Sequence, residues 1–147
     1  MRSSFIATAV VYIVTTIHHL YGASVYNTPR RKDVGTNGGI VPAACLLLLY
    51  LYKRYEKRIF LILYMAISFL VFGLGIGLFE GLYNHILKNI LFFSGMSPTT
   101  WRRFFPAPAY EVPDNIFFET TGILQFFIAT LSTYYIIQLY RSTTTTP

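Results

Sequence analysis

The stretch IFLILYMAISFLVFGLGIGLF, from Ile59 to Phe79, contains 21 residues and no charged side chain. A hydrocarbon core of about 30 Å requires about 20 apolar residues of helix, so this segment is long enough to cross a bilayer. Three further windows without Asp, Glu, Lys or Arg cover residues 3–29, 34–52 and 120–140. The four windows together hold 88 of the 147 residues, and all 18 charged residues lie outside them. This pattern predicts an integral membrane protein.

The composition excludes several other classes of protein. Only 12% of the residues are charged, about half the share of an ordinary soluble domain, and 54% are hydrophobic. The net charge of +6 comes from short basic clusters beside the apolar windows, where Lys and Arg anchor membrane helices, so we expect the lipid bilayer and not a nucleic acid as partner. Cys45 is the single cysteine, which excludes an intrachain disulfide and a CxxC motif.

The windows predict an all-α fold, a four-helix transmembrane bundle that forms a single domain over residues 1–147. The expected helices cover about 5–26, 36–52, 59–87 and 116–140, with a polar connection at 28–33. The second is the least certain by length, since its apolar core at 40–52 has only 13 residues. Residues 94–115 contain four prolines, and the mixture of aromatics and arginines at 99–105 predicts a segment lying at the headgroups.

The positively charged residues leave the orientation in the membrane nearly balanced. Six lie on the side of the two termini and six on the other side. Four of the first six are packed into the very short connection 53–58, and short basic loops favour the cytoplasmic side. We therefore expect both termini in the cytoplasm.

Two adjacent histidines interrupt the first apolar window. Neighbouring residues of an α-helix point about 100° apart, so His18 and His19 face different directions. His18 shares its face with valines, whereas His19 shares a stripe with polar and small residues. This pattern favours His19 as the histidine that faces the interior. The residues of the His19 stripe are Tyr12, Thr15, Gly22 and Tyr26.

The third window ends in a glycine stripe followed by polar residues. Gly73, Gly77 and Gly81 recur at a spacing of four, which lets two membrane helices approach closely. His85 follows Glu80 by five residues, which on an α-helix separates the two side chains by about 140° and predicts that they do not share a face. Glu80, Asn84 and Lys88 continue at spacings of four.

Alternating helix directions would bring the polar residues to one end of the bundle. His18 and His19 lie near the end of the first helix, Glu80, Asn84 and His85 near the end of the third, and Glu119 at the start of the fourth. Ionisable groups in spans usually face a bundle interior and mark a functional site.

Imidazole and carboxylate groups suit a transition metal, whereas histidines near the headgroups also suit haem or a quinone. The set contains no HExxH, ExxH or HxxxH motif, so its spacing does not specify one cofactor, and simple interhelical packing explains it as well. The candidate metal ligands are His19, Glu80, His85 and Glu119, and the candidate residues for binding another cofactor are His18, His19, Asn84 and His85.

Three functions follow from these observations. The small soluble portion and the lack of a familiar catalytic motif favour a structural or accessory subunit of a larger membrane complex, which packs against other subunits or against copies of itself. The alternative is a membrane-embedded redox protein that binds a metal, haem or quinone. A proton or cation transporter ranks third, because the inner halves of the helices carry no charged residue. Whether the protein is an enzyme is left open.

Overall fold

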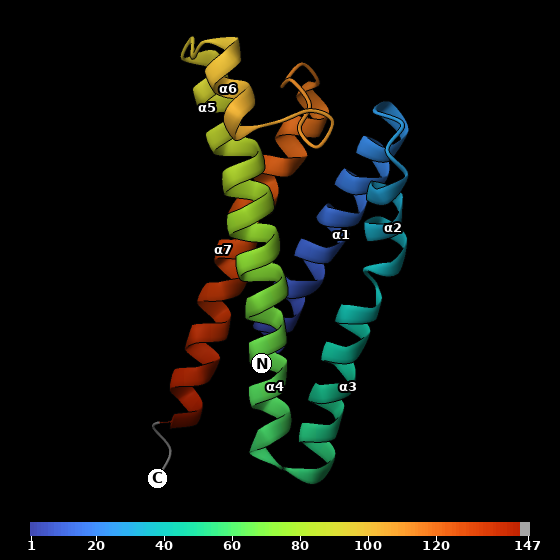
Figure 1. Cartoon of the computed structure of the whole chain (residues 1–147). Helices are drawn as coiled ribbons and strands as arrows, with labels where there is room; N and C mark the ends of the chain where they lie inside the picture. Colours follow the sequence, from blue (N-terminus) through green and yellow to red (C-terminus); the bar gives the residue numbers. More distant parts are fainter. Residues whose placement is uncertain (145–147) are drawn as a thin grey trace.

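The computed structural model describes residues 1–144, and this part of the chain is helical with no strand (Figure 1). The predicted all-α fold is confirmed. The helices are α1 (Arg2–Val25), α2 (Pro29–Asn37), α3 (Ile40–Tyr55), α4 (Arg58–Ser68), the π-helix η1 (Phe69–Leu87), α5 (Lys88–Phe93), α6 (Pro98–Phe104) and α7 (Ile116–Thr144).

Four helical stretches are long and apolar enough to cross a membrane, as the charge windows predicted. They cover Arg2–Val25, Pro29–Tyr55, Arg58–Phe93 and Ile116–Thr143. Successive stretches run in opposite directions (Figure 1). We call the end with residues 94–115 the loop end, and the end with residues 56–57 the hairpin end.

The second stretch begins earlier than predicted. Residues 28–33 were expected to be a polar connection before a helix that starts at about 36, but α2 starts at Pro29 and continues through the basic residues. Proline suits the first turn of a helix because its missing N–H needs no partner there and its φ is already helical. Gly38 and Gly39 separate α2 from α3, and a Cβ on Gly39 would lie 3.0 Å from the Tyr12 hydroxyl of α1.

The third stretch is continuous from α4 through η1 to α5, six residues longer at its end than predicted. Gly73, Gly77 and Gly81 pack against α7, as their spacing of four indicated. A Cβ on Gly77 would lie 2.7 Å from the Cβ of Ala129, and a Cβ on Gly81 would lie 2.6 Å from the backbone nitrogen of Phe126. The close packing of η1 on α7 therefore depends on the absence of these side chains.

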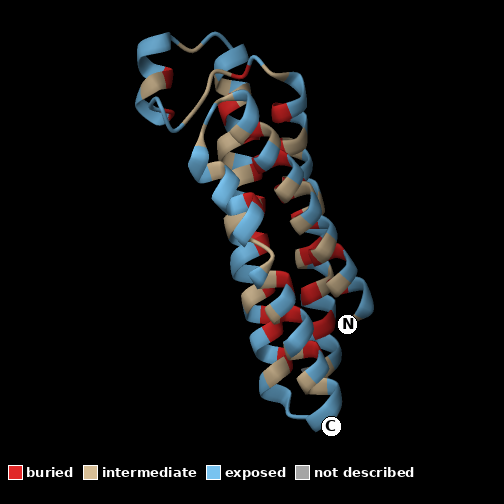
Figure 2. Ribbon diagram, turned by 90° about the vertical axis from the view of Figure 1, so that its right-hand side faces the viewer, coloured by how far each residue is buried: buried red, intermediate tan, exposed pale blue. Residues whose placement is uncertain are grey.

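Buried residues line the inner faces of the helices along the length of the bundle (Figure 2), and they form layers of different polarity. Near the hairpin end, Thr8 and Ser132 are 3.0 Å apart, and the Tyr64 hydroxyl donates to Ser4 at 3.1 Å. The next layer, which we call the apolar layer, consists of Val11, Phe72 and Ala129. The core at the hairpin end consists of Cys45, Leu49, Leu61, Tyr64, Met65, Ile136 and Leu139.

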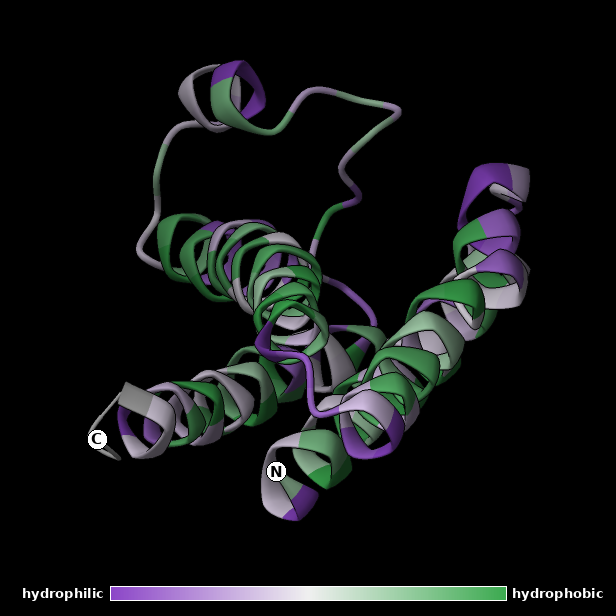
Figure 3. Cartoon of the chain, turned by 90° about the horizontal axis from the view of Figure 1, so that it is seen from below, coloured by the Kyte–Doolittle hydropathy of each residue, from purple (hydrophilic) through white to green (hydrophobic). Residues whose placement is uncertain are grey.

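The outside of the bundle is mainly apolar, and the hydrophilic residues concentrate at the helix ends and connections (Figure 3). Large hydrophobic side chains such as Ile40 and Phe93 are exposed. At the loop end, α6 lies within the predicted interfacial segment, where Ser97 caps its first turn and the buried Trp101 donates to the Lys88 carbonyl at 3.3 Å. The 94–115 connection is thereby attached to the top of the third stretch.

Candidate functional site

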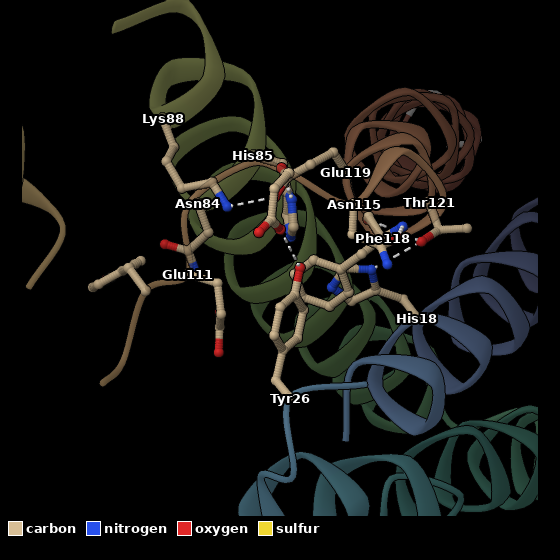
Figure 4. Close-up of polar contacts among 12 residues, drawn as sticks. His18, Tyr26, Asn84, His85, Lys88, Glu111, Asn115, Phe118, Glu119 and Thr121 are labelled. Atoms are coloured by element: carbon tan, nitrogen blue, oxygen red, sulfur yellow. Dashed lines mark hydrogen bonds and ion pairs between the residues drawn. The ribbon is translucent and has the colours of Figure 1, made fainter. Parts of the chain in front are cut away.

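Polar side chains from three of the four long apolar stretches meet at the loop end (Figure 4). His18 comes from α1, and Glu80 and His85 come from η1. His18 and His85 are almost completely buried, whereas the Glu80 side chain is 16% exposed. The oxygen Oε1 of Glu80 lies 3.5 Å from His18 Nε2 and 3.7 Å from His85 Nε2. We call these residues the three-ligand group.

The π-helix brings Glu80 and His85 together. In a π-helix each amide bonds the carbonyl five residues earlier, so side chains five apart lie near the same side of the helix. The predicted separation of about 140° assumed α-helical geometry. That prediction is wrong for this segment because η1 covers Phe69–Leu87 and contains both residues.

The hydrogen bonds around His18 favour the tautomer that carries the proton on Nδ1. The Thr121 hydroxyl donates to the carbonyls of Phe117 and Phe118 at 2.9 and 3.0 Å. With its hydrogen directed to these carbonyls, the Thr121 oxygen is free to accept from His18 Nδ1–H, 3.0 Å away. In a neutral ring the lone pair then lies on Nε2, the atom that faces Glu80.

His85 is oriented in the same way by a carboxylate. Its Nδ1 lies 2.8 Å from Glu119 Oε2, and the other oxygen of Glu119 accepts from the buried Lys88 ammonium at 2.6 Å. An ionised Glu119 makes Nδ1 the donor, which leaves the Nε2 lone pair of a neutral ring facing Glu80. Both histidines thus present Nε2 to the same carboxylate.

The charges of this region do not cancel while both imidazoles are neutral. With neutral imidazoles, two carboxylates (Glu80 and Glu119) and one ammonium (Lys88) leave one excess negative charge. Glu119 lies in the first turn of α7, where the helix dipole stabilises a negative charge. Asn84 donates to Glu80 Oε2 at 2.6 Å but adds no charge. A proton on one imidazole, or a cation between the Nε2 atoms and Glu80, would offset the excess.

A second ion pair covers the region on the loop side. The Arg31 guanidinium makes two bonds to the Glu111 carboxylate, one of them 2.6 Å long, and stacks 5.2 Å from the Phe118 ring. Tyr26 donates to Asp114 at 3.3 Å, and its burial, together with that carboxylate, raises the pKa of the Tyr26 phenol. The phenol therefore remains a neutral donor that helps to hold the connection in place.

A cavity of about 20 Å³ lies beneath this cover. Glu80, Asn84 and His85 line it, together with Arg31 and Glu111. A cavity of this size has room for about one water molecule. The Oδ1 atom of Asn84 is buried without a hydrogen-bond partner in residues 1–144, and a water in the cavity would satisfy it.

Several buried polar atoms deeper in the bundle have no partner in the described part of the chain. Both amide atoms of Gln125 belong to this set, as do Thr15 Oγ1 and His19 Nδ1. The pairs His18–Thr121 and Thr8–Ser132 define the alignment of α1 with α7, and this alignment places Thr15 opposite Gln125. The polar region therefore extends about one helical turn beyond the three-ligand group.

The structure brings most of the predicted site residues together. His18, Glu80 and His85 form the three-ligand group, while Asn84 and Glu119 hydrogen-bond to it. His19 is buried, with its ring 5.3 Å from that of His18, and lies outside the group. The preference for His19 over His18 followed from the polarity of neighbours on α1. That reasoning did not consider the facing helix α7, whose Phe118 ring stacks on the His18 ring with 4.2 Å between the centroids.

The sequence predictions did not assign Lys88, Phe118, Thr121 or Arg31 to the site. Phe118, Thr121 and Gln125 recur at spacings of three and four on α7, so helical periodicity could have indicated this face. The pairing of Arg31 with Glu111 joins residues 80 positions apart and had no sequence signal.

Comparison of the chain with family models, curated proteins and solved structures found no match.

Proposed function

We propose that this membrane protein binds a divalent transition metal through His18 Nε2, His85 Nε2 and Glu80. Two imidazoles and one carboxylate are a ligand set used by catalytic zinc and by non-haem iron(II). The observation that carries the proposal is that one ligand atom from each residue lies within 4.8 Å of the other two.

The distances support a metal in the centre of the group. Bonds of 2.0–2.2 Å in a tetrahedral site separate neighbouring ligand atoms by roughly 3.3–3.6 Å. Glu80 Oε1 is 3.5 Å from His18 Nε2 and 3.7 Å from His85 Nε2, close to these values. All three ligand atoms lie within 4.8 Å of one another, so the two histidine rings would move closer together around a bound metal.

The surroundings of the ligands also support a metal. Metal-binding histidines usually donate their second nitrogen to a carboxylate or another acceptor, which fixes the ring. Glu119 lies beside the second nitrogen of His85 as such an acceptor, and Thr121 lies beside the second nitrogen of His18. The water-sized cavity beside Glu80 and His85 would admit a further small ligand.

Haem and quinone are less well supported as cofactors. His18 stacks on Phe118 at 4.2 Å and touches the edge of His85 at 4.7 Å, which leaves little space for a macrocycle beside the ring. The cavity of about 20 Å³ is much smaller than a quinone ring requires.

The test measures the metal content of the protein purified without chelators from medium containing zinc, iron, manganese and cobalt. We expect about one metal ion per chain, since the residues form one site. His18→Ala, His85→Ala and Glu80→Gln should each abolish stoichiometric binding. Glu119→Gln should weaken binding by about 10–100-fold, as losses of supporting residues do.

His19→Ala is the matched control, because His19 is an adjacent buried histidine outside the three-ligand group. This variant should retain the metal. A native protein that stays metal-free at micromolar zinc or cobalt would contradict the proposal, and so would an equal loss in the His19 variant.

The accessory-subunit function is a second candidate, based on the small part of the chain outside the four apolar stretches. The apolar side chains exposed along these stretches, such as Ile13, Leu70 and Phe127, suit lipid as well as a neighbouring subunit. The test of this second candidate is the mass of the particle extracted in mild detergent, and an isolated monomer would count against it.

The cytoplasmic position of both termini also remains a proposal, based on the basic 53–58 connection. A reporter fused to the C-terminus tests that orientation.

A further inference from the structure

A groove with an apolar floor lies between the beginning of α1 and the end of α3, far from the three-ligand group. It has a volume of about 380 Å³, within the range of ligand-binding sites. Two basic residues, Arg2 and Lys53, stand at its rim, and no acidic residue of the described chain lines it. The remaining lining residues are Met1, Phe5, Leu46, Leu49 and Tyr50.

The helical spacing explains how the floor and the rim arise. Leu46, Leu49, Tyr50 and Lys53 follow one another at i, i+3, i+4 and i+7, so they form one stripe of α3 that is apolar until its last turn. On α1, Arg2 precedes Phe5 by three residues on the same side. Because α1 and α3 run in opposite directions, both stripes place their cation at the hairpin end.

The hairpin end is strongly basic as a whole. Arg2, Lys53, Arg54, Lys57, Arg58 and Arg141 lie there, and Glu56 is the acidic residue of that end. Among residues 1–144 neither Arg2 nor Lys53 forms an ion pair. In addition, α1 begins without a side-chain cap, so its first amides point to the same end with no partner from a capping residue.

We propose that this groove binds an anionic phospholipid. One acyl chain would lie on Phe5, Leu46, Leu49 and Tyr50, and the phosphate would lie between Arg2 and Lys53. Basic pockets between membrane helices recognise anionic headgroups in this way. A hydrophobic helix of another protein would fill the floor, but it would leave the two cations without a counter-charge.

The test is native mass spectrometry of the detergent-purified protein with phosphatidylglycerol or phosphatidylcholine added in increasing amounts. We expect the first phosphatidylglycerol to bind more tightly than phosphatidylcholine. The double variant R2Q/K53Q should weaken the binding of phosphatidylglycerol by roughly 30-fold. Each basic residue near an anionic lipid contributes a factor of about 5 to the affinity, and the two factors multiply.

The matched control is R54Q/K57Q, which removes the same charge from the same end of the bundle but does not line the groove. It should change the affinity less than about threefold, because these two side chains do not contact the headgroup and exposed charges are screened by salt over about 8–10 Å. Equal losses in the two double variants would overturn the proposal, since binding would then depend on overall charge. Equal binding of the two lipids by the native protein would overturn it as well.

A third variant tests the acyl chain separately from the headgroup. Leu46 is 52% exposed, so Leu46→Trp should fold normally and fill the groove while retaining both cations. We expect it to lose tight phosphatidylglycerol binding. If Leu46→Trp binds the lipid normally and inorganic phosphate competes with it, the site is an anion site and the proposal fails.

Discussion

Replacing Lys88 by methionine is expected to destabilise the protein by about 3–5 kcal/mol, the usual effect of removing one partner from a buried ion pair. The Lys88 ammonium lies 2.6 Å from Glu119 Oε1, and both side chains are buried. Without it, the Glu119 carboxylate retains only His85 as a partner. The measurement is the free energy of unfolding in mixed detergent micelles.

Two further variants identify the cause of that loss. In the double variant K88M/E119Q the unpaired charge is removed, so most of the stability should return. Lys57→Met changes an exposed lysine and should have an effect below about 0.5 kcal/mol. A loss below 1 kcal/mol for Lys88→Met would contradict the burial of this pair.

Replacing Gly81 by alanine is expected to cost about 3 kcal/mol, near the upper end of ordinary overpacking. The added Cβ would lie 2.6 Å from the backbone nitrogen of Phe126, and a backbone atom in a helix cannot rotate away. Separation of η1 from α7 would also move Glu80 away from His18. We therefore expect weaker metal binding as well as a lower unfolding temperature.

Gly75 offers the control in the same π-helix. A Cβ there would have its nearest neighbour at 3.6 Å, an ordinary contact with the Leu70 carbonyl. Gly75→Ala should leave stability unchanged or raise it slightly, because alanine restricts the unfolded chain. Similar losses for Gly75→Ala and Gly81→Ala would show that the helix itself, and not its contact with α7, is sensitive.

The sequence was sufficient to predict the architecture because membrane insertion depends on long charge-free windows, which are visible without any contact information. The alternation of helix directions was sufficient to predict that His18, Glu80 and Glu119 lie at the same end of the bundle. The start of α2 was missed, since the basic residues after Pro29 were assigned to a loop although proline favours a helix start.

The geometry of the site was less predictable for two physical reasons. The placement of Glu80 relative to His85 depends on the i→i+5 hydrogen bonds of the π-helix η1. The glycine-rich sequence contains no recognisable signal for this type of helix. The choice between His18 and His19 depends on the facing helix, where Thr121 and Phe118 contact His18. Partners on another helix cannot be derived from the periodicity of one helix.

The apolar layer of Val11, Phe72 and Ala129 has an electrical consequence. Thr8 and Thr15, on either side of it, are seven residues apart, which corresponds to about 10 Å of helix without a buried polar side chain. A transmembrane voltage falls mainly across such a dry region, where carrying one charge through the whole field is worth about 2.3 kcal/mol per 100 mV. A cation that reaches His18 and Glu80 from the loop end crosses little of this field. Its occupancy in sealed vesicles should therefore follow the ion concentration on one side and stay independent of an imposed potential.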